Sequence, residues 1–91
     1  MKCILMCKIE SEVHPEINSE YSRGEYDSSK EALRYALKYA GNDKYTAFAE
    51  RRMLPTIPKV QKTKDTVFLI VSGIGEDYDN IKITYYVKEK D

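Results

Sequence analysis

The chain has 91 residues, of which 42% are hydrophobic and 33% are charged, and its fifteen basic residues balance its fifteen acidic ones. This composition excludes a disordered chain, and no run approaches the ~18–20 apolar residues of a membrane span. We therefore expect a single soluble domain over residues 1–91, located in the cytoplasm and without a signal peptide.

The first predicted element is a strand over residues 2–10, in which apolar side chains occupy both faces as far as Met6. A strand that is apolar on both faces is typical of the interior of a sheet, so we place it there. Residues 11–26 follow; they are polar and show no sustained period. We interpret them as a long connection with room for one short strand.

A helix is predicted over residues 29–40. Ser28 and Glu31 have the spacing of a capping box, in which the serine hydroxyl accepts a hydrogen bond from the backbone of the first turn. Four apolar residues follow at helical spacing, namely Leu33, Ala36, Leu37 and Ala40. Gly41 is expected to end the helix, because glycine readily adopts the left-handed conformation of a C-terminal cap.

Residues 43–53 allow two interpretations. Alanine, glutamate, arginine and methionine dominate their second half and favour a second helix, but Tyr45, Ala47 and Ala49 also alternate as in a strand. We expect the helix. Residues 54–65, which contain two prolines, are predicted to form an extended loop.

The C-terminal third predicts a hairpin. Residues 66–72 read as a strand that is apolar on both faces, residues 73–80 as a loop, and residues 81–88 as a half-buried strand. Together the elements predict an α+β, two-layer sandwich of order β-α-(α)-β-β, with a mixed sheet of three or four strands and a C-terminal β-hairpin. If the strands over 2–10 and 66–72 are neighbours, they should be parallel, with a right-handed crossover.

These strands carry more apolar surface than one helical layer covers. At ~25 cal/mol per Å², leaving ~500 Å² of it bare would forgo on the order of 10 kcal/mol, comparable with the whole stability of a small domain. We therefore predict a homodimer, whose interface contains Ile4, Met6, Phe68, Ile70 and Tyr86. The alternative is that residues 11–26 cover this face.

Charge is segregated along the chain. Residues 10–31 have a net charge of −5, from seven acids and two bases; residues 32–64 have +6, from eight bases and two acids; residues 65–80 carry four acids and no base. Opposite charges steer partners, and tyrosine and arginine are enriched at interface hot spots. We therefore predict a protein partner that is bound by Arg34, Tyr35, Lys38, Tyr39, Arg51, Arg52, Glu76, Asp77, Tyr78 and Asp79.

No pattern of catalytic or metal-ligating residues is recognisable. Cys3 and Cys7 share a strand face but lie about 13 Å apart, too far for a disulfide, so we expect reduced core thiols. His14, the only histidine, precedes a proline in a polar loop and is expected to be solvated. We therefore expect a protein that is not an enzyme and that holds neither a metal nor another cofactor.

In its size, its lack of catalytic motifs and its richness in lysine, tyrosine and isoleucine, the chain resembles small inhibitor proteins of phages and other mobile elements, including anti-CRISPR proteins. This likeness implies a non-enzymatic protein that blocks or recruits a macromolecule through protein–protein contact.

Single-stranded nucleic-acid binding is the alternative. The expected order β-α-α-β-β is similar to the core of a KH domain, in which a Gly-x-x-Gly turn between two helices clamps the nucleic-acid backbone. The matching turn is Gly41-Asn42-Asp43-Lys44, which lacks the second glycine and places Asp43 where it would repel phosphate. A basic stripe can still be formed by Arg34, Lys38, Lys44, Arg51 and Arg52.

Overall fold

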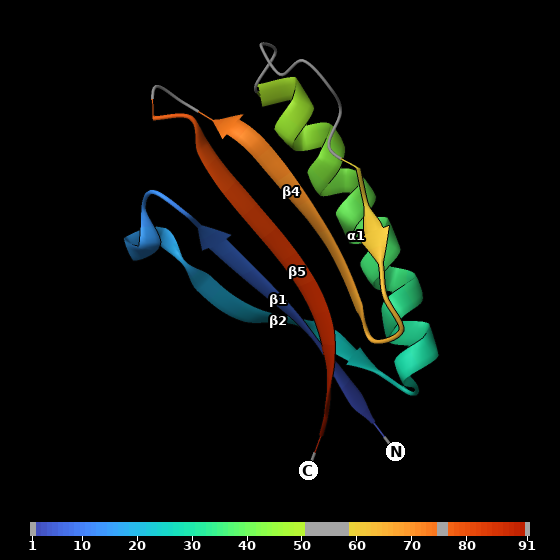
Figure 1. The fold of residues 1–91 in the computed structure, drawn as a ribbon. Helices are drawn as coiled ribbons and strands as arrows, with labels where there is room; N and C mark the ends of the chain where they lie inside the picture. Colours follow the sequence, from blue (N-terminus) through green and yellow to red (C-terminus); the bar gives the residue numbers. More distant parts are fainter. Residues whose placement is uncertain (1, 51–58, 75–76, 91) are drawn as a thin grey trace.

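Figure 1 shows the computed structural model of the chain, in which residues 2–50, 59–74 and 77–90 are described. In chain order the elements are β1 (Cys3–Ser11), the 3-10 helix η1 (Pro15–Ile17), β2 (Ser19–Tyr26), α1 (Ser29–Glu50), β3 (Gln61–Lys62), β4 (Thr66–Ile74) and β5 (Asp79–Glu89). The predicted α+β class is confirmed.

The five strands form one sheet of order β2-β1-β5-β4-β3, and all neighbours in it are antiparallel. The expectation of a mixed sheet of three or four strands is therefore wrong. The physical reason is that β5 inserts between β1 and β4, so these two strands are not neighbours and each pairs antiparallel with β5. The C-terminal hairpin of β4 and β5 is confirmed.

Residues 11–26 are more ordered than a long connection. They contain η1 and the eight-residue edge strand β2, which pairs with β1. Most side chains of β2 are exposed, so the strand lacks the alternation of apolar and polar residues that would reveal it. Gly24, where the register between β1 and β2 shifts, has a φ of 124°, a conformation that other residues rarely adopt.

Helix α1 begins as predicted, because the backbone N–H of Glu31 donates to the Ser28 hydroxyl over 3.2 Å. It does not end at Gly41, which lies outside the left-handed region, and it continues to Glu50. The helical state expected from residue 43 onward is thus confirmed as far as Glu50, but as part of one helix. The end of the helix predicted over 43–53 and the start of the loop predicted over 54–65 fall in residues 51–58, which lie outside the described residues. The strand β3 falls within the part of the expected loop that is described.

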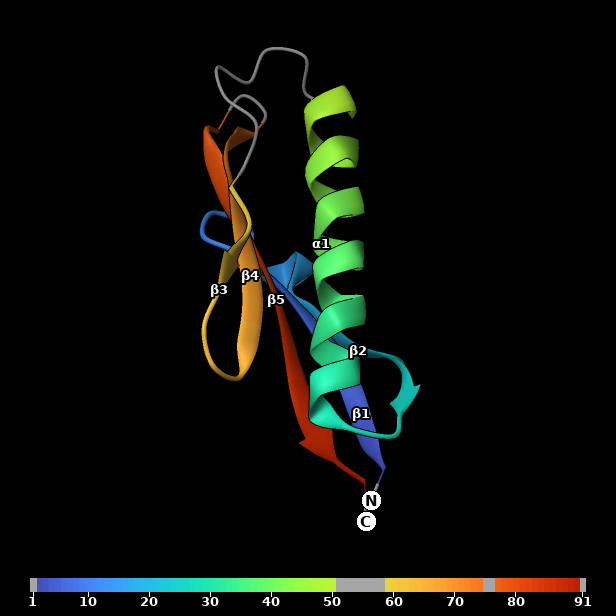
Figure 2. The same cartoon turned by 90° about the vertical axis from the view of Figure 1, so that its right-hand side faces the viewer.

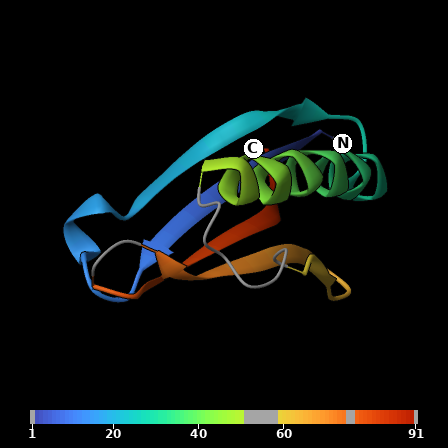
Figure 3. The ribbon, with the colours of Figure 1, turned by 90° about the horizontal axis from the view of Figure 1, so that it is seen from above.

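The core lies between α1 and one face of the sheet (Figure 2). Alanines at the buried positions of α1 bring the helix close to the sheet, and α1 contacts β1, β2, β4 and β5. The core residues are Leu5, Cys7, Ala32, Leu33, Ala36, Ala40, Val67, Leu69, Val71 and Tyr85. In Figure 3 the edge strands β2 and β3 lie on opposite sides of α1, so the twisted sheet curves around the helix.

Candidate binding surfaces

The sheet face opposite α1 is the first candidate surface, and we call it the outer face. No helix or strand of the described residues covers it, because β2 extends the sheet at its edge and does not fold over it (Figure 2). The strand register brings the predicted interface residues together on this face: Met6 pairs with Tyr86, and Ile70 with Lys82. Phe68 lies in the row between these two pairs, and Ile4 lies in the row beyond Met6.

The outer face is less apolar than expected, because polar side chains of the same face cover part of it. Ile70 is 42% exposed, whereas Ile4, Met6, Phe68 and Tyr86 are half-buried. The Lys82 ammonium lies 4.9 Å from the centre of the Phe68 ring. The Tyr86 hydroxyl donates to the carboxylate of Glu20, and this bond raises the pKa of Tyr86.

Tyr35 and Tyr39 lie between α1 and β2. The Tyr35 ring stacks on Tyr26 at a centroid distance of 4.9 Å, and the Tyr39 ring stacks on Tyr85 at 6.2 Å. Arg23 approaches the other side of this cluster, with its guanidinium 4.2 Å from the centre of the Tyr39 ring. Burial, reinforced by the 3.4 Å contact with the Tyr39 hydroxyl, raises the pKa of Tyr26 to about 12. The two helical tyrosines therefore pack α1 against β2 and β5.

Of the other partner-binding residues predicted on helical segments, two are exposed on α1 and two lie outside the described residues. Arg34 and Lys38 are exposed on α1, and the Lys38 ammonium lies 5.0 Å from the centre of the Tyr35 ring. Arg51 and Arg52 lie outside the described residues.

The acidic loop before β5 connects to the loop after β1. Asp77 accepts a hydrogen bond from His14 Nε2 over 2.8 Å, and Glu16 lies 3.2 Å from His14 Nδ1. These contacts, above all the one with Asp77, raise the pKa of His14 against the opposing effect of its partial burial. Tyr78 is 79% exposed, with a φ of 52°, whereas Glu76 lies outside the described residues.

Asp79, predicted to face a partner, is only 4% exposed. The Ser11 hydroxyl and the Val13 backbone N–H, the latter at 3.0 Å, donate to its carboxylate, and the Ser11 bond lowers the pKa of Asp79 most. Ser11 also accepts from the backbone of His14 and not from its ring. This arrangement joins the two loops, and it lacks the serine–imidazole bond by which a histidine activates a nucleophile.

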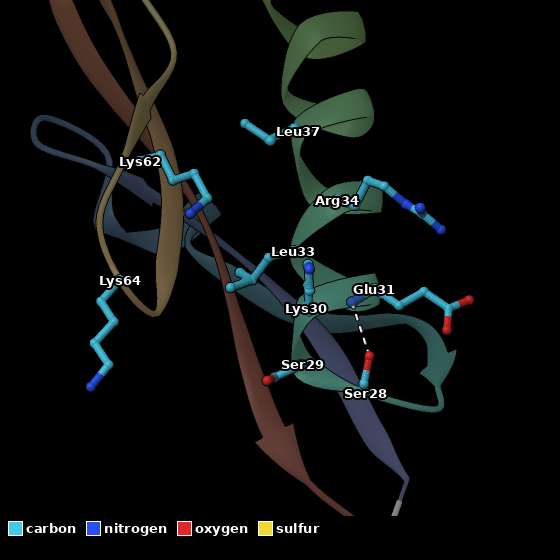
Figure 4. A pocket seen from close by; sticks show the side chains of 9 residues that line it. All are labelled: Ser28, Ser29, Lys30, Glu31, Leu33, Arg34, Leu37, Lys62 and Lys64. Carbon is cyan, nitrogen blue, oxygen red and sulfur yellow. Dashed lines mark hydrogen bonds between the residues drawn. The ribbon is translucent and has the colours of Figure 1, made fainter.

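The second candidate surface is a groove between the first half of α1 and β3, which we call the β3 groove (Figure 4). Its volume is about 630 Å³, and its lining residues are Ser28, Ser29, Lys30, Glu31, Leu33, Arg34, Leu37, Lys62 and Lys64. In Figure 4 Leu33, Leu37 and Lys62 point into the space between the two elements, whereas Arg34 and Glu31 extend from the far side of α1. Of this set, only Arg34 was a predicted site residue.

Cys3 and Cys7 are buried on the inner side of β1 and are not joined in a disulfide, as expected. Within residues 2–50, 59–74 and 77–90, no three His, Cys, Asp or Glu side chains converge as a metal site would require. No helix in this part of the chain combines the length and the apolar character needed to cross a bilayer.

Comparison with protein-family models, with curated proteins and with solved structures gives no match. No family or function is therefore transferred to this chain from another protein. The outer face and the β3 groove are the surfaces on which a function can be proposed.

Proposed function

We propose that this protein is a non-enzymatic binding protein that acts by protein–protein contact through its outer face. The observation that carries this proposal is the outer face itself, which no helix or strand of the described residues covers and on which five apolar side chains lie in adjacent rows of β1, β5 and β4. A face of this kind is a common docking surface, because covering it removes apolar area from water.

In the absence of another partner, the occupant of the outer face is a second copy of the chain. Glu10 and Lys82 are register partners on β1 and β5, and so are Met6 and Tyr86. A two-fold axis that runs between β1 and β5 would therefore place Glu10 of one copy on Lys82 of the other, and Met6 on Tyr86, each contact occurring twice. In this arrangement opposite charges of the two copies face each other, and so do apolar side chains.

The size of the face sets the expected affinity. Four strands at ~4.8 Å spacing and seven residues at ~3.3 Å give a footprint of about 440 Å² per copy, so a dimer covers on the order of 900 Å². This value lies at the lower end of specific interfaces, and we expect a dissociation constant of about 1–100 µM. A contact of this strength is exchangeable, so a partner protein can displace the second copy from the same face.

Sedimentation velocity over a concentration series of about 1–200 µM tests the proposal. The wild-type protein should dimerise, and Met6→Lys should be monomeric because it places a charge at the centre of the contact. Ile70→Lys, at a more exposed position, should also weaken the dimer and carries less risk of misfolding. The matched control is Ile17→Lys, which adds the same charge to η1, where Ile17 is 51% exposed. A wild-type monomer over the whole range, or equal behaviour of the variants and the control, would contradict the proposal.

The inhibitor role implied by the resemblance to phage and mobile-element proteins belongs to the same proposal, with the inhibited protein occupying the outer face. The KH-like alternative loses its structural basis, because residues 41–44 lie inside α1 and do not form a turn.

A further inference from the structure

We propose that the β3 groove binds an acidic peptide segment that carries an aliphatic side chain. This inference goes beyond the proposed function, because the groove and the outer face belong to different parts of the surface and have different chemistry. The groove has three properties that suit such a peptide: its charge, its aliphatic floor and its position at the edge of the sheet.

The lining of the β3 groove is strongly basic. Two elements that are distant in the sequence supply three lysines, Lys30 from α1 and Lys62 and Lys64 from β3 and the residues after it. Of the other charged residues that line the groove among the described residues, Arg34 and Glu31 extend from the far side of α1. None of these cations forms an ion pair with a carboxylate of the described residues. Like charges that are gathered without counter-charges attract an anionic partner, and a nearby helix N-terminus has the same sign.

The floor of the groove distinguishes between anionic partners. Leu37 is 40% exposed although it belongs to the apolar side of α1, and Leu33 lies one turn before it. None of the described residues that line the groove is aromatic. Proteins that bind single-stranded nucleic acid stack the bases on aromatic rings, and this groove offers aliphatic side chains instead. An aliphatic side chain that is flanked by carboxylates fits both the floor and the charge.

The groove lies at one edge of the sheet. The strand order ends at β3, which pairs with β4 through Gln61 and Lys62, and no further strand of the described residues pairs with its other side. Side chains from both β3 and α1 line the groove (Figure 4). An extended peptide can therefore bond to the backbone of β3 and close the open side of the groove.

Fluorescence anisotropy with a labelled peptide of alternating Glu and Leu tests this inference. We expect binding at low salt that weakens as salt is added, and a loss of at least about tenfold in Lys62→Glu. The matched control is Lys88→Glu, which makes the same charge change on an exposed residue of β5 and should alter the affinity by less than about twofold. Leu37→Ser should also weaken binding, because it removes the apolar contact but leaves the charges unchanged.

Two further probes complete the design, a peptide with Lys in place of Glu and an oligothymidylate of equal charge. Tighter binding of the oligothymidylate than of the acidic peptide would overturn the inference in favour of nucleic acid. Equal binding of the two peptides, equal losses in Lys62→Glu and Lys88→Glu, or no binding at about 1 mM peptide would also overturn it. Met6→Lys should keep its affinity for the acidic peptide, so failure of the outer-face proposal and failure of this one are distinguishable.

Discussion

Replacing Gly41 with alanine should stabilise the protein, and the sign of this effect reports whether α1 is continuous. An added Cβ at Gly41 meets nothing within 4 Å, and the backbone there is helical. The substitution therefore neither creates a clash nor buries a side chain, and only the helix propensity changes. Alanine exceeds glycine by about 0.5–1 kcal/mol in a helix interior.

The corresponding shift in Tm is measurable. An unfolding entropy of about 2.1 cal/mol/K per residue gives about 190 cal/mol/K for this chain, so a gain of ~0.8 kcal/mol raises the Tm by about 4 °C. Thermal unfolding followed by circular dichroism at 222 nm measures this shift, and urea denaturation gives the free energy directly. Were Gly41 a left-handed cap that ends the helix, alanine would instead cost about 1 kcal/mol. A lower Tm for Gly41→Ala would thus refute the continuous helix.

Gly24→Ala is the matched comparison, and it should have the opposite sign. The φ of 124° at Gly24 is unfavourable for alanine, while the added Cβ would meet the Tyr26 hydroxyl oxygen at an ordinary 3.5 Å. Backbone strain is therefore the dominant effect, and it costs about 1–3 kcal/mol. Equal shifts for the two glycine variants would show that a property other than local backbone conformation sets both.

Three further predictions concern single contacts. Asp77→Asn should lower the pKa of His14, measured by NMR titration of its imidazole, and an unchanged titration would contradict this. Because the pKa of His14 is raised in the folded state, the contact with Asp77 stabilises the wild type below pH ~6.5, and this stabilisation is lost as the pH rises through the raised pKa. Ser28→Ala should cost about 1 kcal/mol in urea denaturation, since it removes the acceptor of the Glu31 backbone N–H, whereas Ser29→Ala should cost less. Leu69→Ala should cost about 2–5 kcal/mol, because Leu69 is fully buried; a cost below about 1 kcal/mol would contradict its place in the core.

The elements that the sequence predicts well depend on local chemistry. The start of α1 follows from Ser28 and Glu31, which are three residues apart, and the strands over 66–72 and 81–88 follow from their apolar pattern. The end of α1 was missed because a glycine can be either a cap or an interior residue, and contacts beyond the immediate sequence decide between the two. The order of the sheet was missed because the insertion of β5 between β1 and β4 leaves no local signal.

The candidate surfaces also divide into those that local sequence predicts and those that depend on distant contacts. Alternation along a strand has a period of two, so Ile4, Met6 and Tyr86 could be assigned to one face from the sequence alone. The β3 groove could not, because Lys62 comes close to α1 only through the pairing of β3 with β4. Asp79 was expected on the surface because its burial depends on Ser11, 68 positions earlier in the chain.

The central place of β5 has a consequence for synthesis on the ribosome. Because β5, the last of the described strands in chain order, separates β1 from β4, a chain that stops short of residue 79 would leave both β1 and β4 with an unsatisfied inner edge. Such edges recruit strands from neighbouring molecules, so we expect a chain that lacks β5 to aggregate. Folding must therefore be completed after β5 emerges, and a nonsense mutation upstream of Asp79 should yield insoluble material and not a smaller working domain.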